Sequence, residues 1–505
     1  MFKSALDYSL FGVKETTTYP VQTPFGTFDM TKLARMLLNF VKFRNLGLNI
    51  VIPITSYLTG GVTRRMEGFV GEFVDTRSQK LGAKEYMKLA TDGMKEIGVV
   101  NTRAKINVLG QFFKAFDMNE SYRNSMYGGL LRNFPRSGMA LHAAANYPIY
   151  GKTLLGILHD FRVVNGEVMN KTRFMRIGKA DNVTKESLED KWKSFEGNVI
   201  YNYIKHDGNQ VSYDRTALAK DLLKEGKPLE DSALEAQIED IHNSIQGNVQ
   251  YVNSIVDGQI PEDDRVYAQR HYLLSYFMTH RGWLSIAVAR KFKNRHLNLD
   301  TGVVEEGSYR SLWGYVNDYA KEWDGFPQMV ANVSKAWKVG DDVQRRNIKR
   351  VMVELGSLAT LMMLGLMLRS AAEDDDNEDL FALQLSNYLM FRTLNELSSV
   401  QFNIATNFSD TIESPFVGWT TIKNLKNVGD VFSGEEVKYG SYRGMSERQK
   451  YFTKMVPGMK QIFDLQNMNQ TYDTYKFYNE SNFSLTPVNL LYLDRLVKEN
   501  EEGEE

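Results

Sequence analysis

The sequence predicts a mainly α-helical protein, a multi-helix assembly with a small β-hairpin insertion around residues 160–215. Apolar residues recur three and four positions apart through much of the chain, which is the spacing of one face of a helix. Around 160–215 this period gives way to short runs separated by Asn-Gly and Asp-Gly pairs, which favour tight hairpin turns. The length of 505 residues and the apolar content of 43% allow large cores and about three domains.

The N-terminal part is expected to begin with an irregular segment, 1–28, because prolines and a glycine interrupt it. A helical region, 29–160, follows, and Asp29 suits the N-cap of its first helix. Within this region a helix is expected to end before Pro148, because the residue before a proline disfavours helical backbone. Another helix is expected to begin near Lys152.

Residues 45–63, NLGLNIVIPITSYLTGGVT, form an uncharged stretch of 19 residues. That length is enough to cross a membrane, but Pro53 and two later glycines interrupt it. Its β-branched residues favour a buried irregular or strand-like segment instead. The candidate membrane contacts in this stretch are its central apolar residues: Ile50, Val51 and Ile52.

The region 161–215 is expected to contain two β-hairpins. Residues 162–169, RVVNGEVM, carry an Asn-Gly pair, which suits a type I′ turn because both central residues take positive φ. Residues 198–213 offer a second hairpin around the Asp-Gly pair at 207–208.

A second helical region is expected over 216–372. A helix over 230–256 carries apolar residues at spacings of three and four, which indicate a packing stripe within the chain or a short coiled coil. The stripe consists of Leu234, Ile238, Ile241, Ile245, Val249, Val252 and Val256.

An apolar, Met-rich helix over 351–368 closes this region. Its strictly uncharged run, 355–368, has only 14 residues, and Glu354 precedes it. Spanning a bilayer takes about 20 residues, so the sequence favours a buried helix, or one that meets a membrane conditionally, over a stable span. The candidate membrane contacts are Leu361, Leu364 and Leu368.

The remainder of the chain is divided by charge. An acidic loop is expected at 373–380, a helical C-terminal region at 381–497 and a charged, disordered tail at 498–505.

No pattern indicates a catalytic, cofactor-binding or metal site. The chain has no cysteine, which excludes disulfides and thiolate ligands, and its seven histidines lack metal-ligand spacing. Gly151-Lys152-Thr153 matches the end of a P-loop, but Asn146 stands where the loop needs a glycine. We therefore expect a non-enzymatic protein without a cofactor.

The most basic stretch, 281–295, interleaves aromatic and cationic side chains. Such a pattern can contact nucleic acid or lipid headgroups, although the net charge of -1 argues against a dedicated nucleic-acid binder. The alternative is a helix end whose cations lie near the C-terminal dipole. The candidate contacts are Arg281, Trp283, Arg290 and Lys291.

Several segments together carry a family resemblance. They are 241–277 (IHNSIQGNVQ to HYLLSYF), 280–284 (HRGWL), 290–311 (RKFKNRHLNLDTGVVEEGSYRS), 45–49 (NLGLN), the RVVNGEV hairpin and 455–458 (MVPG). These segments resemble a recurring block in very large virion proteins of crAss-like phages of Bacteroidetes. The resemblance implies a structural or cargo polypeptide packaged in the virion, some members of the group leaving with the DNA.

The expected function is therefore that of a non-enzymatic virion protein, stored cargo or an ejection component delivered with the genome. Its expected location is the capsid or tail interior, and the host cell after ejection. Expected partners are other phage virion proteins, with phage DNA or the host membrane contacted during ejection. Two alternatives stay open: a structural module that remains in the virion, and part of an unrecognised nucleic-acid enzyme.

Overall fold

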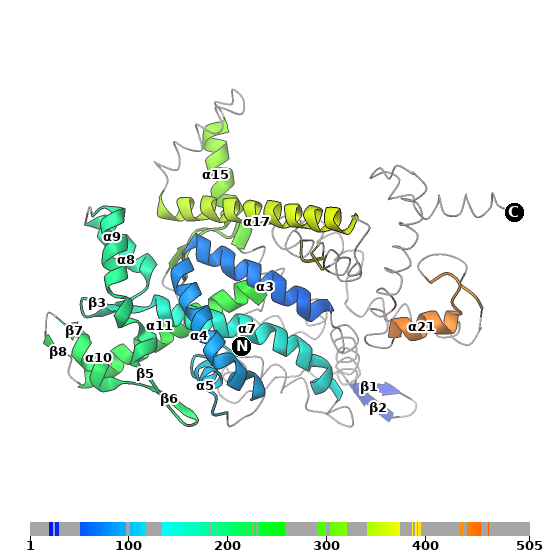
Figure 1. Ribbon diagram of the computed structural model, residues 1–505, viewed down its shortest axis with the longest axis horizontal. Helices are drawn as coiled ribbons and strands as arrows, with labels where there is room; N and C mark the ends of the chain where they lie inside the picture. The colour runs from blue at the N-terminus through cyan, green and yellow to red at the C-terminus, as the bar shows by residue number, and fades with distance from the viewer. Residues whose placement is uncertain are drawn as a thin grey trace. The chain divides into compact units, whose positions relative to one another are not determined.

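The computed structural model is mainly α-helical, as the sequence predicts, with small two-stranded antiparallel hairpins (Figure 1). The chain divides into two compact units, Met1–Leu425 and Lys426–Glu505. The structure describes residues 20–23, 26–29, 51–96, 102–116, 134–181, 183–224, 227–228, 231–257, 288, 290–298, 303–320, 341–373, 386, 389–390, 392–394, 435–437, 442–455 and 463.

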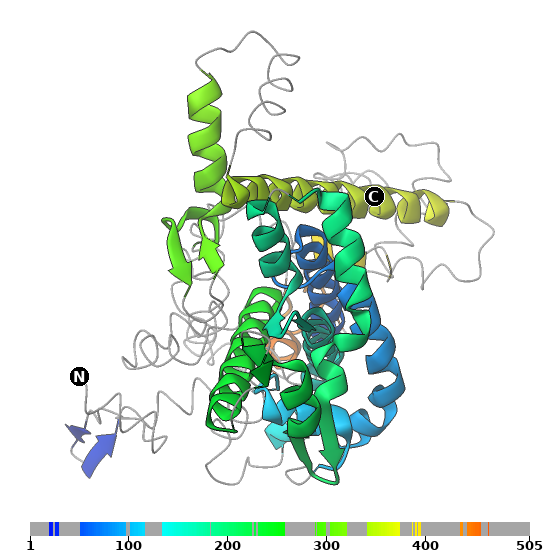
Figure 2. The same cartoon turned by 90° about the vertical axis from the view of Figure 1, so that its left-hand side faces the viewer.

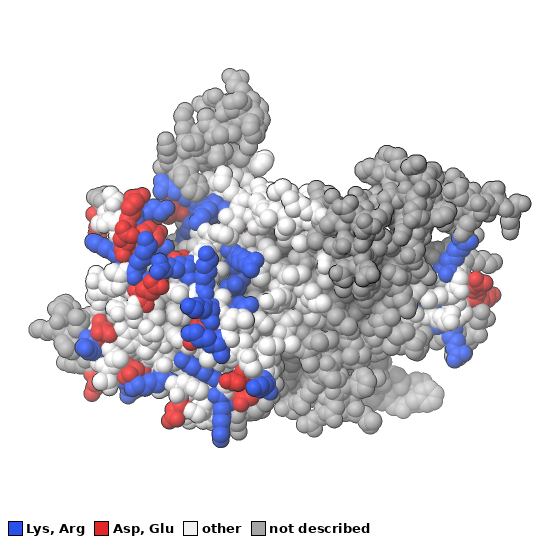
Figure 3. Space-filling view, viewed as in Figure 1, with Lys and Arg blue, Asp and Glu red and all other residues white. Residues whose placement is uncertain are grey.

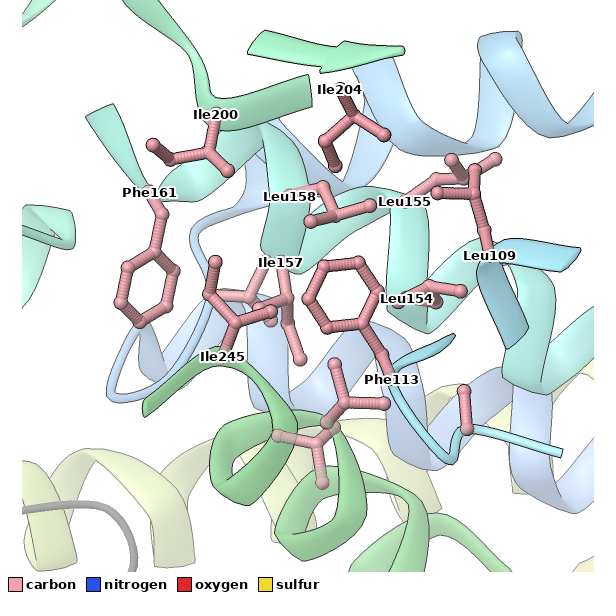
Figure 4. Packing of buried hydrophobic residues seen from close by; sticks show 14 of the residues in the cluster. Leu109, Phe113, Leu154, Leu155, Ile157, Leu158, Phe161, Ile200, Ile204 and Ile245 are labelled. Atoms are coloured by element: carbon pink, nitrogen blue, oxygen red, sulfur yellow. The ribbon is translucent and has the colours of Figure 1, made fainter. Parts of the chain in front are cut away.

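Helix α7 (Phe134–Asp160) is the central element of the first unit. It packs against α3 (Val51–Val70), α4 (Thr76–Lys95), α5 (Lys105–Phe112) and α11 (Asp231–Asp257). Its buried leucines and isoleucine meet side chains from all around it, as the close-up in Figure 4 shows. The fully buried members include Leu154, Leu155, Ile157 and Leu158 of α7, together with Leu109, Phe113, Ile200 and Ile245.

Two expectations about helix boundaries are wrong. Residues 51–70 form the regular helix α3 and not a strand-like segment, because Pro53 lies in its first turn, where no backbone donor is lost. Pro148 lies inside α7 and does not end it. Packing of α7 against its several neighbours outweighs the roughly 3 kcal/mol that an interior proline costs.

The expected hairpins at 160–215 are present. Strands β3 (Arg162–Val164) and β4 (Glu167–Met169) pair through Asn165 and Gly166, whose φ angles of 51° and 88° are those of the predicted type I′ turn. Strands β5 (Ile204–Asp207) and β6 (Gln210–Tyr213) form the second hairpin, with Gly208 at a φ of 59°.

The insertion also contains short helices. These are α8 (Lys171–Ala180), α9 (Lys185–Ser194), two 3-10 turns (Glu196–Asn198 and Ile200–Tyr203) and α10 (Arg215–Asp221). Trp192 of α9, with Val164 and Met169, forms a small separate core beneath α8. A short ladder, β7 (Leu223–Lys224) with β8 (Lys227–Pro228), follows. The insertion is therefore a mixed α/β segment.

The packing stripe predicted on α11 is confirmed. All of its members are buried except Ile238, which is half-buried and still packs on the main core. The stripe is used within the chain, against α7 and α3, as an ordinary intramolecular helix contact.

Helix α17 (Asp342–Glu373) is longer than the 351–368 helix that the sequence predicts. Strands β9 (His296–Asn298) and β10 (Val303–Glu305) and helix α15 (Ser308–Ala320) precede it. In both ribbon views one end of α15 contacts α17 near its beginning, and the rest of α15 points away from α17 (Figures 1 and 2). The predicted acidic loop at 373–380 begins with the last residue of α17 and otherwise lies outside the described residues.

The segment expected to be irregular at the N-terminus contains a hairpin, β1 (Pro20–Thr23) with β2 (Gly26–Asp29). In the second unit the described part contains helix α21 (Glu447–Met455) and an isolated bridge between Glu436 and Ser446. The helix expected after Asp29 and the charged tail at 498–505 lie outside the described residues, as does most of the C-terminal region.

Candidate functional site

The first turns of α17 are held to the rest of the first unit by buried ion pairs. The guanidinium of Arg350 lies 3.0 Å from Glu67 of α3 and 2.9 Å from Glu72, just beyond α3. One turn earlier, Arg346 lies 3.2 Å from Glu72. Lys349 donates a hydrogen bond of 3.2 Å to the carbonyl of the last residue of α3. These contacts fix the beginning of α17 against the end of α3.

Arg290 and Lys291 belong to the same charge network. Arg290 pairs with Glu67, and Lys291 pairs with Glu354 of α17, with both side chains of the latter pair only 4% exposed. The structure therefore corrects the expected contact of these two cations with nucleic acid or headgroups, because their charges are compensated inside the protein. Two further candidates lie outside the described residues: Arg281 and Trp283.

The pKa values in this network reflect a competition between burial and opposite charge. Burial raises the pKa of Glu67, but Arg350 and Arg290 outweigh it and hold the pKa below its usual value. Burial lowers the pKa of Arg350, yet Glu67 and Glu72 outweigh it and raise the pKa. Both partners stay ionised at neutral pH, so this pair joins the helices and neither group is poised to exchange a proton.

From Met352 onward, α17 exposes apolar side chains on the faces that do not carry its ion pairs. Their exposed fractions run from 43% to 64%, at Met352, Leu355, Met362, Met363, Leu364 and Met367. Consecutive positions on a helix point about 100° apart, so residues 362–364 cover most of the circumference. Of the two alternatives expected for the 351–368 helix, full burial is therefore wrong, although Val351 and Glu354 are buried and Leu358 and Leu361 are half-buried. A helix that is apolar all round is ordinarily covered, which marks this half of α17 as a contact surface.

The candidate membrane contacts fall on the two helices α3 and α17. Leu364 is exposed and Leu361 is half-buried, whereas Val51 begins α3 and Ile52 is half-buried there. None of the helices in the described part of the chain is both long and apolar enough to cross a membrane. Ile50 lies outside the described residues, and the description does not reach the side chain of Leu368.

Helix α3 exposes further apolar side chains that sequence reasoning did not select. They are Ile54, Tyr57, Leu58 and Phe69. They were missed because the segment was interpreted as strand-like. Side chains alternate with a period of two along a strand but of 3.6 along a helix, so the two structures expose different residues. A helical wheel over 51–70 would have placed them.

Gly151-Lys152-Thr153 lies in the middle of α7 and is not a phosphate-binding loop. The hydroxyl of Thr153 donates to the carbonyl of Ile149 within the helix at 2.9 Å. The Nζ of Lys152 lies 3.4 Å from the hydroxyl of Tyr57 and 5.6 Å from the centre of its ring. The motif therefore connects α7 to α3 through a cation–π contact.

A second charged group surrounds the end of α7. The buried carboxylate of Asp160 accepts a hydrogen bond of 3.0 Å from the hydroxyl of Ser78. Burial, together with the nearby charge of Asp75, raises the pKa of Asp160 to about 7. Asp75 caps α4 by accepting from the Ser78 amide at 2.6 Å, and Lys171 lies 3.0 Å from it. These contacts tie the start of α4 to α7 and α8.

Among the described residues, no three His, Asp or Glu side chains gather in a way that could hold a metal ion. Comparison with protein-family models, with curated proteins and with solved structures finds no match to this chain.

Proposed function

We propose that this chain is a non-enzymatic bacteriophage virion protein, stored cargo or an ejection component delivered with the genome. In this proposal the exposed apolar half of α17 contacts the host membrane while the protein is in transit. The observation that carries the proposal is the exposure of Met362, Met363, Leu364 and Met367 on successive faces of one helix. The resemblance of several segments to virion proteins of crAss-like phages supports the phage assignment.

The apolar half of α17 suits an apolar medium better than a one-sided groove. A helix that docks into a groove keeps one polar face, whereas 355–368 contains no charged residue and only Ser357 and Thr360 as hydroxyl side chains. At 1.5 Å per residue, this run of 14 residues is about 20 Å long, which is less than the hydrocarbon thickness of a bilayer. Partial insertion fits these dimensions.

The buried charges at the beginning of α17 support the same proposal. Arg350 and Glu354 are each compensated by an opposite charge, and removing one partner of a buried pair typically costs about 3–5 kcal/mol. The first half of α17 is thereby fixed, and the second half is presented outward from a rigid base. This arrangement lets the apolar half of α17 contact a membrane without any unfolding of the core.

Vesicle flotation with the purified full-length chain tests the membrane contact. We expect the protein to float with liposomes and a Leu361→Asp/Leu364→Asp variant to lose most of this association, because a carboxylate at membrane depth costs at least about 2.5 kcal/mol. An Ile177→Asp/Leu297→Asp variant is the matched control, since it also alters two apolar residues, both exposed and both outside α17. If both variants floated to the same extent, the proposed membrane contact of α17 would be wrong.

The second candidate is a structural module that stays in the virion and packs against other virion proteins. The methionines favour it, because flexible Met side chains adapt readily to a protein surface. Quantifying this chain in particles before and after DNA release separates the two functions. Cargo is lost with the DNA, whereas a structural module is retained in the emptied particle.

A further inference from the structure

Helix α4 presents a stripe of lysines along its outer face. Lys80, Lys84 and Lys88 follow one another at intervals of four residues, and all three are exposed. Residues four apart lie on the same side of a helix, so the three ammonium groups share one face. Figure 3 shows Lys and Arg side chains gathered over α4 on the face that is drawn.

Most of this charge is not compensated within the described part of the chain. Lys88 pairs with Glu85 at 2.6 Å, but no described residue forms an ion pair with Lys80 or Lys84. Like charges four residues apart repel one another and destabilise a helix. An anionic surface that lies against the stripe would relieve this repulsion. A partner that binds the stripe must therefore carry negative charge.

Apolar side chains border the same stripe. Met87 and Met94, seven residues apart on α4, are 67% and 46% exposed. On a wheel of 100° per residue, both lie within about 40° of Lys80. The outer face of α4 therefore has a cationic side and an adjacent thioether side. Cationic heads beside exposed apolar groups are the arrangement of an interfacial helix.

The stripe is built on a rigid support. Helices α4 and α7 approach so closely that a Cβ on Gly82 would lie 2.2 Å from the backbone nitrogen of Gly156. The inner side of α4, including Ser78 and Tyr86, is buried. The lysines therefore stand on a preformed support, where the stripe from Lys80 to Lys88 spans about 12 Å and the segment to Met94 about 21 Å.

We propose that the Lys80–Lys84–Lys88 face of α4 binds the headgroups of an anionic bilayer, with Met87 and Met94 entering the acyl boundary. This inference rests on the proposed membrane contact of the chain and names the lipid that the contact selects. A bilayer is favoured over duplex DNA because the phosphate backbone of DNA offers no apolar counterpart to the two exposed methionines.

The test compares the full-length chain with a Lys80→Gln/Lys84→Gln/Lys88→Gln variant in flotation assays. The vesicles contain phosphatidylcholine alone or with 30% phosphatidylserine. A Lys185→Gln/Lys191→Gln/Lys193→Gln variant is the matched control, because its three lysines are exposed on α9 and one of them also pairs at i,i+3. Melting temperatures establish that all variants are folded.

We expect the α4 variant to bind anionic vesicles about a hundredfold more weakly, since each lysine near an anionic surface contributes about fivefold. Binding of the α9 variant should match the unaltered chain, and 0.5 M NaCl should weaken the unaltered chain as the α4 substitutions do. Equal binding of both variants to anionic vesicles overturns the proposal. So does a selective loss of binding to a duplex DNA probe, which would assign the stripe to nucleic acid.

The two proposals fail in different ways. If the function of α17 is wrong but the stripe is correct, Leu361→Asp/Leu364→Asp leaves the preference for anionic over neutral vesicles unchanged. If the stripe is wrong but α17 is correct, the α4 lysine variant still floats with both kinds of vesicle as the unaltered chain does. If the unaltered chain floats with neither kind of vesicle, both proposals are overturned.

Discussion

Asp160 has a carboxyl group whose surroundings oppose its ionisation. It lies at the end of α7, fully buried, and its Oδ1 accepts from the Ser78 hydroxyl at 3.0 Å and from the Asp75 amide at 3.4 Å. Burial and the charge of Asp75 raise its pKa from 3.8 to about 7, although Arg162 acts in the opposite direction. The carboxyl is therefore protonated in the folded state over a range where the unfolded chain is ionised.

This shift has a definite sign for stability. Between about pH 4 and pH 7 the folded state holds a proton that the unfolded state has lost, so the contribution of Asp160 to stability falls as pH rises. An Asp160→Asn variant keeps the Oδ1 acceptor and cannot ionise. We expect it to be more stable than the unaltered chain at pH 7, by more than about 1 kcal/mol, and similar at pH 4.

Urea unfolding at several pH values between 4 and 7 measures this difference. Asp75 is the internal contrast: burial raises its pKa, but the Ser78 amide and Lys171 outweigh burial and lower it. The stability that Asp75 contributes is therefore present above the unfolded pKa and is lost as pH falls. Parallel stability curves for the unaltered chain and Asp160→Asn would contradict the role assigned to Asp160.

Single residues also show what the sequence can and cannot specify. The Asn165–Gly166 turn was predictable because its chemistry is local, and positive φ selects these residue types. The pairing of Arg350 with Glu67 was not, because 283 positions separate the two residues. The same applies to Lys291 with Glu354, 63 positions apart. A basic pattern in the sequence does not reveal whether its charges face solvent or a buried carboxylate.

At the scale of elements, the contact between α4 and α7 depends on Gly82. A Cβ at Gly82 would meet the backbone of Gly156 at 2.2 Å, a distance that side-chain movement cannot relieve. Gly82→Ala should force the helices apart and destabilise the protein by at least about 1–3 kcal/mol, the usual cost of overpacking a core. Thermal and urea unfolding monitored by circular dichroism measures the loss.

Gly314 of α15 is the matched control for that substitution. It also lies inside a helix, but nothing lies within 4 Å of the position where its Cβ would stand. Gly314→Ala should therefore stabilise its helix by about 0.5–1 kcal/mol. If Gly82→Ala and Gly314→Ala changed stability in the same way, Gly82 would not be required for the close approach of α4 and α7.

Element prediction succeeded where a periodic stripe was present and failed where tertiary packing overrode local signals. The apolar spacing of α11 gave both its helical state and its buried face, because that stripe is long and regular. Pro148 and the glycines of α3 suggested breaks that do not occur. At Gly60 a Cβ would lie 2.6 Å from Ile149 of α7, so that glycine serves helix packing and does not end the helix.

At the scale of the whole molecule, the apolar half of α17 is the feature that the sequence described only in part. The run of residues predicted a helix, and a helix is present. Its exposure was not predictable. An apolar segment is expected to be covered, but its sequence does not show whether the rest of the chain or another molecule covers it. The lysine stripe of α4 escaped prediction for a related reason, since which face of α4 turns outward is decided by α7.

Exposed apolar side chains on α17 should affect association and not stability. A Met363→Gln/Met367→Gln variant should keep its free energy of unfolding within about 0.5 kcal/mol, because both side chains are more than half exposed. An Ile348→Ala substitution, at a buried position in the anchored half of the same helix, should cost about 2–5 kcal/mol. Sedimentation velocity should show less self-association for the methionine variant, since large exposed apolar patches promote it. A marked loss of stability in that variant would mean that these methionines are core residues.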